Sequence, residues 1–200
     1  MNLAACAGLP LQSLAGTWFR TVKLRYLNVS LSAAHTDVIY SRFSPGPAAA
    51  TPFQLLYFGE DVVVTQFESS VLLGSPAHFV PAAPGGAFVT LPFSVSLQAV
   101  ADLTSAQGQR ILGVSAQELT GDWTGYQMRG ALTSVPQPVG TAPTQELGEA
   151  LFQVPGLEGF VALSAKDPTK RTLVVLPQKL QAGSSISFSD PLAGVSFRIP

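Results

Sequence analysis

The chain has 200 residues, of which 46% are hydrophobic and 12% are charged. This length supports one sizeable hydrophobic core and is short for two full domains, and the hydrophobic content excludes a disordered chain. The charged fraction is about half the ~25% usual in soluble domains, which indicates exposed apolar surface of the kind used for a partner or for self-association. The net charge of −1 and the lack of a Lys/Arg-rich run argue against direct nucleic-acid binding.

Cysteine and histidine usage argues against a metal site. Cys6 is the single cysteine, which excludes an internal disulfide and a multi-Cys metal site. The two histidines, His35 and His78, lie far apart and no HExxH motif occurs, so no metal is expected. The first ten residues make a poor signal peptide, and no apolar run approaches the ~20 residues that span a bilayer. We therefore expect a cytoplasmic protein without a membrane span.

The pattern along the chain is typical of strands. Sixteen prolines and 18 glycines separate short segments rich in Val, Phe and Leu. Strands are predicted at residues 17–22, 38–43, 53–58, 88–100, 109–113, 159–164, 171–176, 185–188 and 195–199. Pro92 predicts that the 88–100 strand is broken or has an edge position, because proline cannot donate to a sheet ladder.

Two helices are predicted among these strands. One covers residues 61–72, where the acidic pair Glu60-Asp61 suits a helix N-terminus and the apolar residues that follow share one face. The other covers 144–153, with Pro143 at an early helical position and Gly148 as a slightly unfavourable interior residue. Residues 44–52, 81–86 and 134–143 are predicted loops. The economical fold class is a single α+β domain with a mixed β core and a few helices.

Common nucleotide and hydrolase motifs are missing. The sequence has no GxGxxG after a strand, no GxxxxGK[ST] and no GxSxG. Polar side chains within otherwise apolar segments are more informative, because they cost free energy unless they are paired or used. These residues are Arg20, Arg42, Tyr57, Glu68 and Ser164. A structural ion pair between an arginine and Glu68 would explain two of them, whereas a pocket would explain all five; counted alone, the residues favour the structural interpretation.

The same segments, in this order, resemble the RES domain family from about Thr17 to Leu180. The matching elements are Trp18-Phe19-Arg20, Arg42-Phe43-Ser44-Pro45, Leu56 to Glu60 followed by Glu68, LTGDW at Leu119 to Trp123, LGEA at Leu147 to Ala150, and Leu163-Ser164-Ala165. Two positions depart from the family pattern: Ser44 stands where the family usually has Asn, and Leu163 stands where it usually has Pro before the serine.

The resemblance implies an ADP-ribosyltransferase-like fold and NAD as the substrate. It divides the chain into an extension at 1–16, a RES domain at 17–180 and C-terminal strands at 181–200 packed on the same domain. It also implies a toxin of a bacterial toxin–antitoxin pair that cleaves the nicotinamide–ribose bond of NAD, as a glycohydrolase or a phosphorylase. An ADP-ribosyltransferase that modifies a cellular protein is the first alternative. A non-enzymatic binding module on a degenerate RES fold, supported only by Ser44 and Leu163, is the second.

The resemblance assigns roles to the polar residues. Arg20 and Arg42 would anchor the diphosphate, because a guanidinium makes paired hydrogen bonds to phosphate oxygens. Glu68 would be catalytic by stabilising positive charge on the ribose, and Arg42 would be catalytic beside it. In the same pocket, Tyr57 would stack on nicotinamide, Ser164 would bind the ribose or hold Glu68, and Tyr26 would be a weaker candidate for the wall. The expected partner is an Xre-type antitoxin with a helix-turn-helix region, and self-association is equally compatible with the composition.

Overall fold

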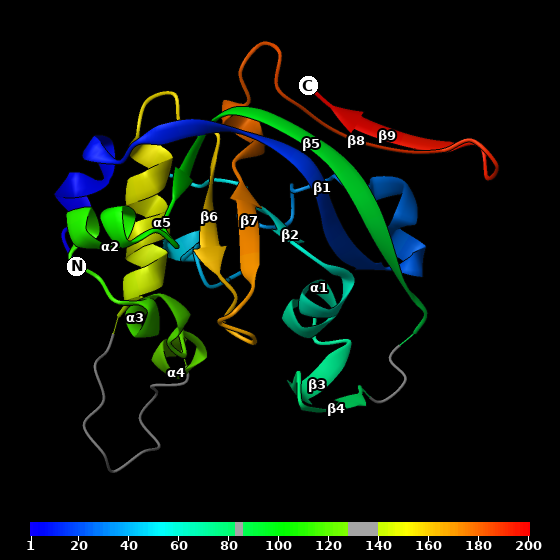
Figure 1. Ribbon diagram of the computed structural model, residues 1–200, viewed down its shortest axis with the longest axis horizontal. Coiled ribbons are helices and arrows are strands. Elements are labelled where there is room, and N and C mark those ends of the chain that lie inside the picture. Colours follow the sequence, from blue (N-terminus) through cyan, green and yellow to red (C-terminus); the bar gives the residue numbers. More distant parts are fainter. Residues whose placement is uncertain (83–85, 128–139) are drawn as a thin grey trace.

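A mixed β-sheet forms the frame of the protein (Figure 1). The computed structural model describes residues 1–82, 86–127 and 140–200. Within them, the large sheet has the strand order β1-β2-β7-β6-β5-β8-β9, and β1 also pairs with β5, so five of the strands close into a ring. The strands are β1 (Leu11–Lys23), β2 (Leu56–Gly59), β5 (Phe88–Asp102), β6 (Gly159–Leu163), β7 (Arg171–Val175), β8 (Ser185–Asp190) and β9 (Val195–Ile199). The predicted single α+β domain is confirmed.

The longest pairing in the ring joins β1 to β5 in antiparallel register from Leu11↔Ala101 to Lys23↔Phe88. Pro92 lies opposite Phe19 in this ladder, whereas β8 pairs with β5 only at residues 94–96. At Pro92 the strand therefore has β1 on one side and no paired strand on the other among the described residues, which suits a residue that cannot donate to a ladder. As a whole, however, β5 is continuous and pairs with β1, β6 and β8, so the prediction of a broken or edge strand holds only locally, around Pro92.

Two hydrophobic cores lie on the two faces of the sheet. Successive side chains of a strand point to opposite faces, so Leu56 and Phe58 of β2 join the core inside the ring, whereas Tyr57 packs against the other core. This second core is covered by helices and contains Phe43 and Phe160, whose rings meet edge to face at 5.0 Å. Tyr57 is thereby directed to the helix-covered face of the sheet.

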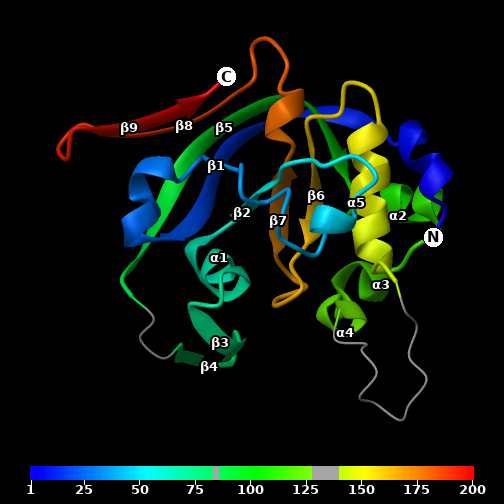
Figure 2. The same ribbon diagram turned by 180° about the vertical axis from the view of Figure 1, so that it is seen from behind.

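In Figure 2 most helices lie at one end of the sheet, and a further short helix, drawn in blue, lies at the other end. The helices are α1 (Val62–Glu68), α2 (Ala106–Leu112), α3 (Ala116–Thr120), α4 (Thr124–Gln127) and α5 (Pro143–Gln153), with 3-10 helices η1 (Leu3–Gly8), η2 (Leu24–Val29), η3 (Gly46–Ala48) and η4 (Pro177–Lys179). Helix η1 places Cys6 and Leu9 in the core with α5. The boundaries drawn at 16/17 and 180/181 stay predictions. Among the described residues, no helix has both the length and the hydrophobicity to cross a membrane.

Two predicted strands are wrong. Residues 38–43 form turns with one isolated bridge between Ser41 and Ser44, because side chains of other elements take up their backbone groups, as described below. Residues 109–113 fall mostly in α2, whose N-cap Ser105 accepts from the Gly108 N–H at 3.0 Å and whose end is set by Gly113 at φ 60°. A capping serine and a terminal left-handed glycine define a short helix here. The predicted 53–58 strand is shorter and shifted, as β2.

The predicted helices differ in accuracy. The 144–153 helix is confirmed as α5, with Pro143 as its first residue. The 61–72 helix ends already at Glu68, and Ser70 has φ 58°, a left-handed conformation that stops a helix. The chain then forms an unpredicted hairpin of β3 (Leu72–Ser75) and β4 (His78–Pro81). Of the predicted loops, 44–52 contains η3, and residues 83–85 and 134–139 lie outside the described residues.

Candidate functional site

A cavity of about 250 Å³ lies where β1, β2 and the end of α1 face the segment between α3 and α4. In Figure 1, α1 lies on one side of the lower ends of β6 and β7, and α3 and α4 lie on the other. The cavity is lined by Arg20, Thr21, Ser41, Arg42, Tyr57, Phe58, Gly59, Thr65, Glu68, Ser69, Trp123 and Thr172. The fold thus brings together four of the six predicted site residues, from segments widely separated in sequence.

Glu68 is the last residue of α1 and reaches the cavity because of how this short helix is placed. Asp61 caps its start by accepting from the Val64 N–H at 2.8 Å. Gly59 precedes it, and a Cβ there would lie 2.7 Å from the Val64 side chain. Glycine at this position therefore lets the helix pack directly against the end of β2.

The Glu68 carboxylate is held by the turn that follows β6. Its Oε1 accepts hydrogen bonds from the Ser164 hydroxyl and from the Ala165 N–H, the latter at 3.0 Å. Ser164 is fully buried, and its Oγ also accepts from the N–H groups of Lys166 and Asp167, each at 3.1 Å. Ser164 therefore fixes the turn after β6 and the carboxylate together. Within the described chain, Oε2 of Glu68 has no hydrogen-bond donor.

Tyr57 contributes its ring to the cavity and uses its hydroxyl as an anchor. The hydroxyl shares a hydrogen bond with the Ser41 hydroxyl at 2.9 Å and accepts from the Phe43 N–H at 3.2 Å. Burial is the largest influence on this phenol and raises its pKa to about 12. Tyr57 is therefore neutral at physiological pH, with its ring fixed in place.

Arg42 is almost completely buried, at 6% exposure, and ties three segments together. Its Nη1 donates to the Leu163 carbonyl at 2.8 Å and its Nη2 donates to the Leu119 carbonyl. Burial lowers its pKa, whereas the negative charge of Glu68 acts in the opposite direction. Its Nε is buried and has no hydrogen-bond partner among the described residues. An unsatisfied buried donor is costly, so Arg42 Nε is an unexplained polar group next to the cavity.

The turn that carries Arg42 is held by α5. The Gln145 side chain is buried, and its Nε2 donates to the carbonyls of Ser41 at 2.9 Å and Ser44 at 3.2 Å. Its Oε1 accepts from the Ala142 N–H at 3.0 Å, so the same amide also fixes the start of the helix. These bonds use backbone groups that a strand at 38–43 would have needed.

Arg20 lies on β1 and bridges to β2. Its Nη1 donates to the Tyr57 carbonyl at 2.9 Å and its Nε donates to the Ser30 carbonyl at 3.0 Å. Burial lowers its pKa to about 10, which leaves it positively charged at neutral pH. The cavity is therefore lined by two guanidinium groups and one carboxylate.

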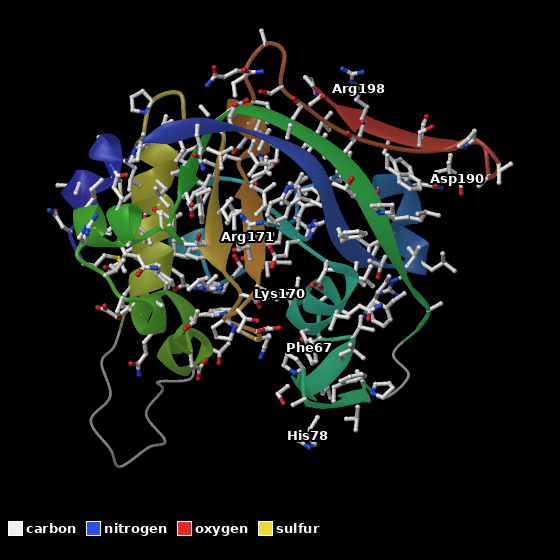
Figure 3. The ribbon with its side chains drawn as sticks, in the orientation of Figure 1. Phe67, His78, Lys170, Arg171, Asp190 and Arg198 are labelled. Carbon is white, nitrogen blue, oxygen red and sulfur yellow. The ribbon has the colours of Figure 1, made fainter. Side chains whose placement is uncertain are left out.

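The structural interpretation, an ion pair between an arginine and Glu68, is not found among the described residues. Glu60 pairs with Arg171 at 2.8 Å beside an Asp61–Lys170 pair at 3.0 Å, at the start of β7 (Figure 3). Both cavity arginines donate to backbone carbonyls instead. Neither arginine forms an ion pair with a carboxylate in the described chain, so both keep their positive charge and some of their N–H donors for a ligand.

Two predicted site residues lie outside the cavity wall. Ser164 is behind Glu68, where it holds the carboxylate. Tyr26 is 49% exposed on η2 and has the Arg25 guanidinium 4.8 Å above its ring. Sequence reasoning missed Ser41, which adjoins Arg42, and Trp123, although Trp123 ends the LTGDW segment that carries the family resemblance. Their positions depend on turns that periodicity does not reveal.

The described residues contain no group of three His, Cys, Asp or Glu side chains that could hold a metal ion. His78, on β4, lies at the far end of the hairpin from the rest of the protein (Figure 3). The ionisable groups at the cavity are therefore the arginines, Tyr57 and Glu68.

Comparison with known proteins assigns the family. The RES domain model matches residues 17–192, so the chain belongs to the RES domain family. No curated protein sequence matches it. Among solved structures, a chain of the M. tuberculosis MbcT–MbcA toxin–antitoxin complex is similar, with a TM-score of 0.61 and 15% sequence identity over 98% of this chain and 90% of that chain. At this identity the likeness establishes the fold.

Proposed function

We propose that this protein cleaves the nicotinamide–ribose bond of NAD and acts as the toxin of a toxin–antitoxin pair. The observation that supports this most directly is the placement of Glu68. Its carboxylate is fixed by Ser164 and Ala165 at a cavity that also contains the charges of Arg20 and Arg42. One fixed carboxylate beside two cations suits a substrate that has a diphosphate and develops positive charge on a sugar.

The proposed reaction begins with departure of nicotinamide. The C–N bond breaks, nicotinamide leaves with the bonding electron pair, and C1 of the ribose gains oxocarbenium character. An acceptor then forms the new bond to C1 and loses its proton; water gives ADP-ribose, and phosphate gives its phosphorylated form. Glu68 stabilises the cationic sugar and orients its hydroxyls. Such preorganised electrostatic groups typically contribute about 3–4 kcal/mol each.

The other cavity residues bind the nicotinamide and the diphosphate, which flank the ribose at which NAD is cleaved. Arg20 and Arg42 hold the diphosphate through the donors not engaged by backbone carbonyls. The Tyr57 ring, fixed by its hydroxyl, packs against nicotinamide. Arg42 also lies close enough to influence Glu68 electrostatically, so it acts both in binding and in setting the charge of the site.

A protein partner accompanies this function. The structurally similar chain was solved in a toxin–antitoxin complex, and exposed apolar side chains occur on η2 (Tyr26, Val29) and on the β3–β4 hairpin (Phe79, Val80). We propose an Xre-type antitoxin with a helix-turn-helix region, in the cytoplasm, where NAD is available. The alternative is a homo-oligomer, in which a second copy of the chain would cover the same apolar side chains of η2 and the hairpin. Sedimentation of the chain alone and with its antitoxin distinguishes the two.

The test is nicotinamide release from NAD by the purified chain, with and without phosphate. Glu68→Gln keeps the size of the side chain and removes its charge, and we expect a loss of about 100–1,000-fold in turnover. Glu60→Gln is the matched control, because Glu60 pairs with Arg171 and does not line the cavity. It should keep nearly full activity.

The outcomes separate the alternatives. Dependence on phosphate identifies a phosphorylase, and release without it identifies a glycohydrolase. If labelled NAD and lysate leave label on a protein, and nicotinamide release requires that lysate, the protein is an ADP-ribosyltransferase. NAD that binds without turnover in any of these conditions would contradict enzymatic function and support a binding module. Growth arrest with undiminished cellular NAD would contradict the toxin mechanism.

A further inference from the structure

A second cavity adjoins the candidate site. Its volume is about 380 Å³, and it lies between the α3–α4 segment and the start of α5. It is lined by Glu118, Gly121, Asp122, Trp123, Ala142, Pro143 and Thr144. Trp123 also lines the first cavity, so the indole forms a wall common to both.

The first cavity is too small for a whole dinucleotide. Pockets that enclose a drug-sized ligand usually occupy ~300–1,000 Å³, and NAD, with two nucleosides and a diphosphate, is larger than most such ligands. A cavity of about 250 Å³ accommodates the nicotinamide ribose but not the adenosine as well. The adenosine half of the proposed substrate therefore needs a second place, and the adjoining cavity shares Trp123 with the first.

The second cavity has groups suited to a nucleoside. An indole face stacks on a base, an interaction worth about 1–3 kcal/mol per base. Thr144 is 3% exposed and lines the cavity, yet its hydroxyl makes no hydrogen bond to any described residue. A nearly buried hydroxyl at the wall of a cavity, with no partner among the described residues, can form a hydrogen bond with a ligand.

The charge of this cavity is negative. Glu118 accepts from the Ser115 N–H at 2.8 Å, and Asp122 accepts from the Thr124 hydroxyl at 2.5 Å. These bonds hold the pKa of both carboxyls below their ordinary values, so both are ionised at neutral pH. Glu118 keeps one oxygen without a donor among the described residues, whereas Asp122 is also influenced by the Gly125 N–H and by the charge of Lys166. The start of α5 contributes only about half a positive charge, so the two carboxylates dominate.

We infer that the second cavity binds the adenosine half of NAD, with Trp123 against the adenine and Thr144, Glu118 and Asp122 around its ribose, and that it selects NAD over NADP. This inference rests on the proposed function. A carboxylate accepts hydrogen bonds from ribose hydroxyls, as in dinucleotide-binding folds. The same carboxylates repel the 2′-phosphate that distinguishes NADP, because like charges at close range are unfavourable.

The experiment compares nicotinamide release from three substrates that contain the same scissile bond. NAD has an adenosine, NADP has an adenosine with a 2′-phosphate, and nicotinamide mononucleotide has neither. The variant Glu118→Gln/Asp122→Asn removes both charges and keeps both local structural roles, because Gln serves in a capping box and the Asn side-chain oxygen can still accept from Thr124. Thr144→Val removes the hydroxyl and keeps the shape of the side chain.

We expect the double variant to raise the NADP-to-NAD ratio of kcat/KM by about tenfold and to leave nicotinamide mononucleotide unchanged. Thr144→Val should raise the KM for NAD several-fold and again leave the mononucleotide unchanged. Glu146→Gln is the matched control, since this exposed acid of α5 does not line the cavity and should not change the ratio.

Two results would overturn the inference by itself. One is an unchanged NADP-to-NAD ratio in the double variant, and the other is an equal effect of Thr144→Val on NAD and on the mononucleotide. Failure of the proposed function has a different signature: the unmodified protein would release nicotinamide from none of the three substrates and would show no calorimetric binding of ADP-ribose. Without release but with binding, ADP-ribose affinity that Thr144→Val weakens would still support the adenosine site, and unchanged affinity would contradict it.

Discussion

Helix α5 passes so close to the turn carrying Arg42 that a Cβ on Gly148 would lie 1.9 Å from the carbonyl oxygen of Phe43. In sequence, Gly148 is only a weak point in a helix. In the fold, it allows the helix backbone to touch the backbone of the turn, where Gln145 completes the contact through its side-chain amide. The position of Arg42 at the cavity therefore depends on the absence of a side chain one helical turn after Gln145.

Gly148→Ala should destabilise the protein, although alanine is the better helix former by about 1 kcal/mol. The added methyl group must displace backbone atoms, and overpacking of this kind costs about 1–3 kcal/mol. Urea denaturation would measure the change in the free energy of unfolding. Gly8→Ala is the control, because a Cβ at Gly8 meets nothing within 4 Å. Equal stability of the two variants would show that α5 can move away from the turn without cost.

Ser164→Ala should lower nicotinamide release by about tenfold, because Glu68 loses one of its two donors. Stability should also fall by about 1–3 kcal/mol, since two backbone N–H groups lose their acceptor. Ser184→Ala separates the effects, because Ser184 is a buried serine that accepts from the Gln98 N–H at 3.3 Å away from the cavity. Turnover that falls equally in both variants would show that Ser164 acts only through stability.

Tyr57→Phe should keep the affinity for NAD within a few-fold and lower stability by about 1–2 kcal/mol, because the Phe43 N–H is left without its acceptor. Tyr57→Leu, which lacks an aromatic ring, should raise the KM about tenfold. Steady-state kinetics at a temperature where both variants are folded distinguishes ring from hydroxyl. A loss in the phenylalanine variant as large as in the leucine variant would mean that the hydroxyl itself contacts the substrate.

Asp61→Asn should affect stability in a pH-dependent manner. Desolvation raises the pKa of Asp61, but hydrogen bonds from the Val64 N–H and from Lys170 outweigh it, and the net pKa is lowered. A carboxyl whose pKa is lower in the folded than in the unfolded state stabilises the fold above the unfolded pKa of ~3.9, and this is lost as the pH falls through the folded pKa. At pH 7 the loss should be below about 1 kcal/mol, because the pair with Lys170 is exposed and asparagine retains the cap. The melting temperatures of the two proteins should converge as the pH falls from about 4 through the lower pKa of folded Asp61; a constant difference would implicate the cap instead.

The sequence predicts the parts of the fold that depend on local pattern and flanking residues. The β5, β6 and β7 strands and α5 have apolar periodicity with clear boundaries, and each is found at or near its predicted place. The 109–113 prediction failed because a short apolar segment suits helix and strand equally, and the decisive signals were the cap Ser105 and the left-handed Gly113. Residues 38–43 failed for a non-local reason: their backbone groups are bound by Gln145 and Tyr57, which lie elsewhere in the chain.

In the candidate site, too, local sequence pattern predicts some residues and tertiary contacts determine the others. Polar residues inside apolar segments identify Arg20, Arg42, Tyr57 and Glu68, which the fold brings to one cavity. Trp123 and Ser41 could not be found in this way, because each follows a turn whose direction depends on tertiary contacts. The separate positions of Ser164 and Tyr26 likewise depend on which side of a turn faces the cavity, a property that a one-dimensional pattern does not encode.

The ring of strands has one weak seam. Strands β1 and β2 are paired only at Phe19↔Gly59, whereas the other edge of β1 is paired with β5 along its whole length. Arg20 spans this seam by donating to the Tyr57 carbonyl, and the cavity opens directly beside it. A molecule that binds both Arg20 and the β2 side of the cavity would therefore hold β1 and β2 together and stabilise the closed ring of strands. Substrate occupancy should slow amide hydrogen exchange in β2, even at positions such as Leu56 that do not line the cavity.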